Sequence, residues 1–131
     1  PYLSGQIWAL SKKCLDLMRE GVEIYKNYLR PLIPHARRFW PLGLVKPDDA
    51  WGAFCLKTED KIILSVWHFD GGPNKIEIPL VGLKVNHAII LYPNSHATTF
   101  EFRADTLMVV LASQTARIFE LTTITTSRAL Q

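Results

Sequence analysis

The chain has 131 residues, of which 48% are hydrophobic and 21% charged, with 15 Lys and Arg against 12 Asp and Glu. This length suits one domain, or a small domain with an appendage, that buries its core without a metal or disulfide. The composition excludes general disorder. The longest apolar run, residues 107–112, falls far short of the roughly 20 residues that span a bilayer.

The charge is unevenly distributed along the chain. Residues 1–46 hold eight Lys and Arg and three Asp and Glu, a net charge of +5, whereas residues 47–131 carry −2. We expect no membrane partner, and the absence of a signal-peptide pattern leaves the cellular compartment open. Because patterned sequence begins directly at Pro1, we expect the chain to be a piece of a longer protein.

The first third of the chain is predicted to be helical. Ser11 is a plausible N-cap, with Leu10 and Leu15 placed as a hydrophobic staple. Apolar residues then recur at helical spacing, at Cys14, Met18, Val22, Tyr25 and Leu29. The helix is predicted to end at Arg30, since Pro31 disfavours helical geometry in the residue before it. The wide apolar arc is typical of a helix that packs on another element.

Residues 31–49 contain four prolines and are predicted to connect this helix to the rest. They also include Phe39, Trp40 and Leu44, and that much apolar surface predicts a connection packed against the protein.

From Ala50 onward the hydrophobic period changes to two, which indicates strands. The predicted strands are 50–57, 61–69, 75–80, 87–92, 97–103, 106–112 and 115–122. Turn residues separate them, Gly71-Gly72 being predicted as a hairpin turn, and Pro79 should lie at a sheet edge or a strand end. The predicted fold is mainly β, an antiparallel sandwich of about seven or eight strands (residues 48–131) preceded by an N-terminal helix and a packed linker (1–47).

No catalytic or metal-binding pattern stands out. The adjacent Asp48 and Asp49 point to opposite sides of an extended chain and are expected to solvate a turn. The four histidines lack the spacing of metal ligands, so neither a metal nor a cofactor is expected. Cys14 and Cys55 are predicted to be small buried hydrophobic residues.

Two groups of aromatic residues invite a binding interpretation. The segment 37–40, Arg-Arg-Phe-Trp, combines cations with aromatics as nucleic-acid binders do. Because the basic excess is spread over the first third, a solvated face or an acidic protein partner explains it better, and no nucleic acid is expected. Trp51 and Trp67, on strands, are candidate platforms for stacking a sugar, and core packing is the alternative for each.

Several short segments, in order, carry a resemblance to a known family. They are Leu3-Ser4-Gly5-Gln6-Ile7-Trp8, Leu10-Ser11, Glu20-Gly21-Val22-Glu23-Ile24-Tyr25-Lys26, Trp40-Pro41-Leu42-Gly43-Leu44, Asp49-x-Trp51-x-Ala53 and Ser65-Val66-Trp67. Together they resemble the region where bacterial α-galactosidases (melibiases) of glycoside hydrolase family 36 pass from the catalytic barrel to a C-terminal β-sandwich. The resemblance covers about residues 3–70, with the remainder similar only in pattern.

The resemblance implies a division of labour. The family removes terminal α-linked galactose with retention, using two barrel aspartates that would precede Pro1, so no catalytic residue is carried over. The first helix would be the last barrel helix. Gln6 replaces a residue that is commonly acidic in the family, and His68 replaces a frequent Arg, which leaves a sibling glycosidase specificity open.

The sequence therefore predicts a fragment without glycosidase activity of its own, a structural accessory to the parent enzyme's barrel. The expected partners are that barrel, with an α-galactoside as the parent's substrate, and a second copy of this chain as an alternative cover for the helix. The alternative function is a free-standing carbohydrate-binding module that uses Trp51 or Trp67. A nucleic-acid binder using Arg37 and Arg38 is the third hypothesis.

Overall fold

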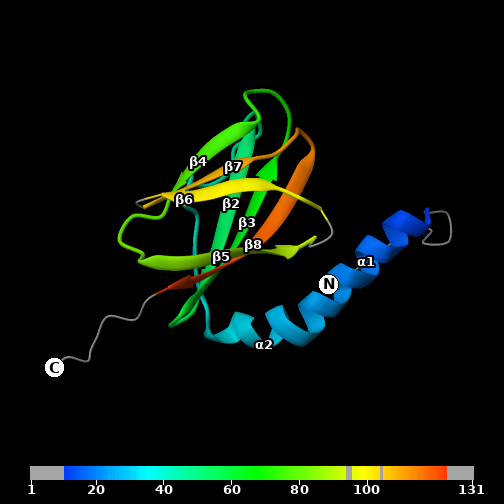
Figure 1. Cartoon of the computed structure of the whole chain (residues 1–131), viewed down its shortest axis with the longest axis horizontal. Coiled ribbons are helices and arrows are strands. Elements are labelled where there is room, and N and C mark those ends of the chain that lie inside the picture. Colours follow the sequence, from blue (N-terminus) through cyan, green and yellow to red (C-terminus); the bar gives the residue numbers. More distant parts are fainter. Residues whose placement is uncertain (1–10, 94–95, 104, 124–131) are drawn as a thin grey trace. The chain divides into compact units, whose positions relative to one another are not determined.

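The computed structural model of the chain describes residues 11–93, 96–103 and 105–123. The chain divides into two compact units, Pro1–His35 and Ala36–Gln131, seen in Figure 1 as a helical segment and a β-structure. No helix in the described ranges is both long enough and apolar enough to cross a membrane.

The first unit is a run of helical turns of three kinds. It comprises α1 (Lys12–Ile24), a π-helical segment (Tyr25–Leu29), α2 (Arg30–Leu32) and a 3₁₀ turn (Ile33–His35). Ser11 caps α1 as predicted, its hydroxyl accepting a hydrogen bond from the Cys14 amide at 3.2 Å. Leu10, the other half of the predicted staple with Leu15, lies outside the described residues.

The prediction that the helix ends at Arg30 is wrong, because helical backbone continues through Pro31 to His35. Proline lacks an amide hydrogen, and its ring crowds the carbonyl four residues earlier. The π-helical segment directly before α2 widens the turn there, and Pro31 falls in the first turn of α2. Proline is tolerated near the start of a helical segment, and the Arg30 amide before it keeps its bond to the Tyr25 carbonyl oxygen.

The apolar stripe of the first unit is only partly covered. None of the described residues in these helical segments is buried. Cys14 is exposed, so its predicted burial is wrong. One amphipathic helix has no second surface of its own against which to bury a stripe.

The second unit is a two-layer antiparallel β-sandwich, so the predicted fold class is confirmed. Its strands are β1 (Arg37–Phe39), β2 (Trp51–Lys57), β3 (Lys61–His68), β4 (Lys75–Pro79), β5 (Val85–Tyr92), β6 (Thr99–Arg103), β7 (Thr106–Val110) and β8 (Thr115–Thr123). One sheet has the order β1-β2-β3-β8-β5 and the other β4-β7-β6, and every pairing is antiparallel.

Seven of these strands match the predicted ranges closely, and β1 was not predicted. Arg37 pairs with Lys57 and Phe39 with Cys55, so the sheet begins inside the expected linker. Along the chain, the boundary between the two compact units falls between His35 and Ala36. A three-residue strand is too short to show a period of two.

The core lies between the sheets and follows the alternation of the strands. Its buried members are Ala53, Cys55, Ile62, Leu64, Val66, Ile78, Leu80, Leu107, Val109, Leu111, Phe119 and Leu121. Phe100 of β6 meets Phe119 of β8 edge to face, with ring centroids 5.2 Å apart, which joins the two layers. Pro79 ends the edge strand β4, as predicted.

Two connections differ from the prediction. Gly71-Gly72 is not a hairpin turn, because it joins β3 of one sheet to β4 of the other. Both glycines have positive φ, 82° and 71°, where a side chain would be strained. The connection before β2 is only partly packed: Leu42 contacts the core cluster, but Leu44 is 69% exposed.

Candidate functional site

The two candidate tryptophans lie on adjacent strands of the five-stranded sheet but on opposite faces. Trp51 of β2 is paired with His68, a buried residue, and Trp67 of β3 is paired with Gly52. Side chains of paired residues share a face, and neighbours along a strand alternate. Trp51 therefore belongs to the inner face and Trp67 to the outer one.

Trp51, which is partly buried, is engaged with the buried His68. The two rings are stacked, with centroids 4.1 Å apart and an interplanar angle of 2°. The Trp51 indole N–H donates to the Pro73 carbonyl oxygen at 3.3 Å, and the side chain packs against the core cluster. Trp51 thus takes the core-packing role that was the alternative to sugar stacking.

His68 joins two of the connections that pass from one sheet to the other. It is 1% exposed, and its Nδ1 lies 2.8 Å from the carbonyl oxygen of Leu111, between β7 and β8. Its Nε2 lies 2.9 Å from the carbonyl oxygen of Gly71, between β3 and β4. In the sequence, His68 stands out only as a departure from the family and as one of four histidines without the spacing of metal ligands. Its alternation with Leu64 and Val66 was the available sign that it points inward.

Trp67 presents its side chain on the outer face and is 36% exposed. In register with it are Gly52 on β2 and Ala116 on β8, two of the smallest residues. A Cβ atom at Gly52 would lie 2.8 Å from Val45 Cγ2 and 3.2 Å from Phe69 Cε2, so these side chains cover the β2 side. The β8 side, over Ala116, stays open.

A hollow of about 430 Å³ occupies that open side. Its lining includes Trp67, Phe69, Asp70, Gln114, Thr115 and Ala116. The Asp70 carboxylate accepts a hydrogen bond from the Gly71 amide through Oδ1 at 3.0 Å. Gln114 has φ 61° and donates its backbone amide to the carbonyl oxygens of His68 and Phe69, at 2.7 and 2.8 Å. These bonds hold a non-glycine residue in the left-handed region.

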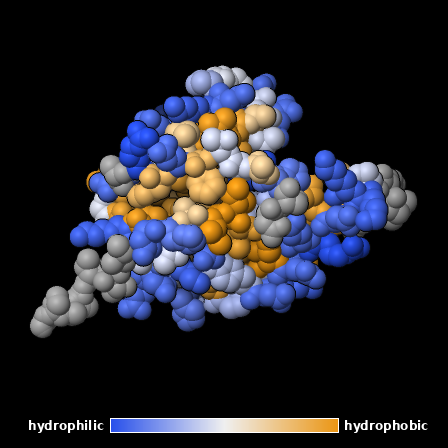
Figure 2. All heavy atoms as spheres, viewed as in Figure 1, coloured by the Kyte–Doolittle hydropathy of each residue, from blue (hydrophilic) through white to orange (hydrophobic). Residues whose placement is uncertain are grey.

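The surroundings of the hollow are partly apolar. Phe69 is 39% exposed and also borders a second hollow, of about 450 Å³, with Val45 and Pro47. Independently of these hollows, Figure 2 shows hydrophobic side chains gathered among hydrophilic ones on the face that it draws. Trp40, 43% exposed, has its ring centroid 5.3 Å from that of Phe54. Trp40 and Trp67 are thus both exposed, whereas Trp51 is partly buried.

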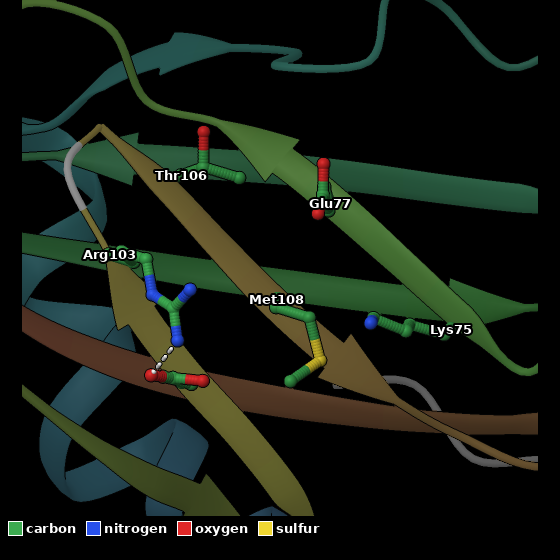
Figure 3. A pocket seen from close by; sticks show the side chains of 6 residues that line it. Lys75, Glu77, Arg103, Thr106 and Met108 are labelled. Atoms are coloured by element: carbon green, nitrogen blue, oxygen red, sulfur yellow. Dashed lines mark hydrogen bonds and ion pairs between the residues drawn. The ribbon is translucent and has the colours of Figure 1, made fainter.

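The outer face of the three-stranded sheet carries a different hollow, of about 310 Å³. Figure 3 shows Lys75, Glu77, Arg103, Thr106 and Met108 around it. Arg103 donates to Glu101 at 2.7 Å, a hydrogen bond that raises the pKa of the guanidinium. The charges of this lining balance, and it contains no aromatic ring. It has the character of a solvated sheet face.

The remaining candidates take structural or solvent-facing positions. Burial raises the pKa of the Cys55 thiol to about 12, which makes it unreactive. Asp49 accepts from the Lys46 amide at 2.8 Å and so closes a turn before β2. Arg37 and Arg38 lie exposed on β1. Within the described ranges, no three His, Cys, Asp or Glu side chains are grouped to hold a metal ion.

Comparisons with models of protein families, with curated proteins and with solved structures find no match to this chain. A functional interpretation therefore rests on two observations. One is the set of short segments whose order along the chain resembles that of the α-galactosidases, and the other is the geometry around Trp67.

Proposed function

We propose that residues 36–131 form a non-catalytic C-terminal β-sandwich domain of a retaining glycosidase similar to the α-galactosidases. The observation that carries the proposal is the order and spacing of Trp40-Pro41-Leu42-Gly43-Leu44, Asp49-x-Trp51-x-Ala53 and Ser65-Val66-Trp67. These segments lead into a sandwich whose first long strand begins at Trp51. In the family that they resemble, the same order marks the passage from barrel to sandwich.

The structural positions of these residues support the proposal. Leu42 packs against the core cluster, and Asp49 closes the turn that feeds β2. Ala53 and Val66 are fully buried. Residues with such positions attach an incoming chain to the sandwich, which is a structural requirement rather than a catalytic one.

The carboxylates of the charged hollow do not suggest glycoside chemistry. Glu77 and Glu101 lie in one row across the three-stranded sheet, each in register with Met108. Glu101 is already paired with Arg103. A retaining glycosidase needs two carboxyl groups about 5–5.5 Å apart on either side of the bond that is cleaved. In the proposal this work belongs to the parent barrel.

The apolar stripe of the helical unit also supports the proposal, because it would be buried by the barrel of a parent enzyme. Its described helical residues include no buried one, although apolar side chains recur along one face of α1. Burying such a stripe stabilises a helix by roughly 25 cal/mol per Å² of apolar surface. The proposed cover is the barrel of the parent chain, whose substrate would be an α-galactoside.

The test is to express both this chain and the full product of its gene, and to assay each with p-nitrophenyl α-D-galactoside. The proposal predicts hydrolysis by the full product and none above buffer by the 131-residue chain. Matched β-galactoside and α-glucoside substrates, as controls, report a sibling specificity. Hydrolysis by this chain alone, or a full product that cleaves no glycoside, would contradict the proposal.

The second candidate function is carbohydrate binding by the sandwich itself. The exposure of Trp67 beside an open hollow favours it specifically. Of the two candidate tryptophans, only Trp67 remains available for a sugar, because the Trp51 ring is stacked on His68 and its N–H donates to Pro73.

A further inference from the structure

We propose that the hollow beside Trp67 binds a neutral pyranose, with the apolar face of the sugar against the indole ring and its hydroxyls on Asp70 and Gln114. The inference rests on the second candidate function, carbohydrate binding, and is independent of the glycosidase assignment. The hollow's volume of about 430 Å³ lies in the usual range of small-molecule sites, roughly 300–1,000 Å³.

The open space beside Trp67 results from the residues in register with it. Side chains of paired residues on adjacent strands stand about 4.5–5.5 Å apart at Cβ, so a large neighbour would cover the indole. On β8 that neighbour is Ala116, whose methyl group leaves room. On the β2 side, Val45 and Phe69 fill the space over Gly52. The space left for a ligand therefore lies on the Ala116 side.

The polar edge of Trp67 is also unused. Among the described residues its indole N–H has no hydrogen-bond partner, whereas the N–H of Trp51 donates to Pro73. A tryptophan that packs in a protein usually satisfies this donor, as Trp51 does. Trp67 thus offers both a partly exposed ring and a free donor, the combination that an amphipathic ligand uses.

Two polar side chains converge on the same hollow. Asp70 uses Oδ1 for the Gly71 amide, which leaves Oδ2 as an acceptor for hydroxyl groups. Gln114 offers an amide that both donates and accepts. Its backbone is held at φ 61° by bonds to the carbonyl oxygens of His68 and Phe69. Strained backbone of this kind gathers at functional sites because the surrounding structure must enforce it.

The charge of the lining selects the class of ligand. It contains Asp70 and neither lysine nor arginine, so a phosphate or carboxylate would meet a like charge with no cation to offset it. An aromatic wall suits an apolar face, while a carboxylate and an amide suit hydroxyl groups. A neutral pyranose combines an apolar ring face with a rim of hydroxyls.

The test is a titration of the isotope-labelled chain with methyl α-D-galactopyranoside and methyl α-D-glucopyranoside, followed by the four tryptophan indole N–H signals in NMR. We expect saturable shifts centred on Trp67 with at least one of the two sugars. The variants are compared by the backbone amide signals of residues 114–116, which every variant keeps: Trp67→Ala should weaken binding about tenfold or more, and Asp70→Asn several-fold. Ala116→Leu should abolish binding altogether, because the leucine side chain fills the hollow while every proposed ligand contact stays in place.

Trp40→Ala is the matched control, because Trp40 is an exposed tryptophan of the same unit outside this hollow. It should leave the affinity unchanged. The inference is overturned if neither sugar gives a saturable shift, if Trp40→Ala weakens binding as much as Trp67→Ala, or if adenosine monophosphate binds as tightly as the sugars. If the chain binds sugar but its gene encodes no glycosidase, only the accessory-domain proposal fails. If the gene encodes a glycosidase but the chain binds neither sugar, only this inference fails.

Discussion

Replacing His68 with alanine is expected to destabilise the sandwich strongly. The substitution removes the side chain that joins the β3–β4 and β7–β8 crossovers through the carbonyl oxygens of Gly71 and Leu111. It also removes the ring stacked on Trp51. Both connections pass from one sheet to the other.

The expected cost follows from the burial of each contact. Leu111 is 2% exposed, so its carbonyl loses a partner away from water, at about 1–3 kcal/mol. The bond to Gly71 is partly exposed, and water can replace it at a cost of roughly 0.5–1.5 kcal/mol. Removing a large buried side chain adds the cost of a cavity beside Trp51. The two hydrogen-bond terms alone sum to about 1.5–4.5 kcal/mol, before the cavity is counted, and that is already a large part of the roughly 5–15 kcal/mol that stabilises a typical domain.

The assay is urea denaturation of the wild type and of His68→Ala under identical conditions, with the midpoint and slope compared. His87→Ala is the matched control, because His87 is exposed on β5 and should change the free energy of unfolding by less than about 0.5 kcal/mol. His68→Gln, which can keep one of the two bonds, should fall between them. A His68→Ala variant within about 0.5 kcal/mol of the wild type would show that the contacts of His68 do not stabilise the sandwich.

Three further outcomes are expected. Gly82→Ala should lower the free energy of unfolding, measured in urea, by about 1 kcal/mol, because Gly82 has φ 82°, where a side chain is strained. A Cβ atom there would meet no other atom within 4 Å, so backbone strain is the whole effect, and an unchanged stability would contradict this. In the native protein at pH 8, iodoacetamide should label the exposed Cys14 but not Cys55, and both after denaturation. Labelling of Cys55 in the folded state would count against its burial. Burial raises the Cys55 pKa from 9.0 to about 12, so the neutral thiol contributes to the free energy of unfolding in full below pH 9, and this contribution is lost as the pH rises toward 12. Glu101→Gln should lower stability by less than about 0.5 kcal/mol, because its ion pair with Arg103 is exposed, and a loss above 1 kcal/mol would show a larger role.

The strands were predictable because their alternation reflects one buried and one exposed face. The run Ile62, Leu64 and Val66, which faces the core, shows this pattern in the sequence itself. Strand β1 was missed because three residues between prolines give no period. The helix continues past Pro31 through a π-helical segment, and the apolar spacing of the sequence does not predict such a segment.

The candidate site was predictable only in part. Trp67 was recognised as a candidate, but the sequence could not distinguish it from Trp51, since both follow strand alternation. The distinction depends on register: Trp51 is paired with buried His68, and Trp67 is in register with Ala116. Asp70 and Gln114, more than forty positions apart in the chain, come together only through the pairing of β3 with β8.

The proposal that this sandwich is the accessory domain of a glycosidase is decided by the coding sequence upstream of Pro1. We expect it to encode a run of alternating strands and helices that forms a barrel, with two aspartates placed at strand ends before Leu3-Ser4-Gly5. An upstream sequence of another fold, or a barrel without two such aspartates, would contradict it.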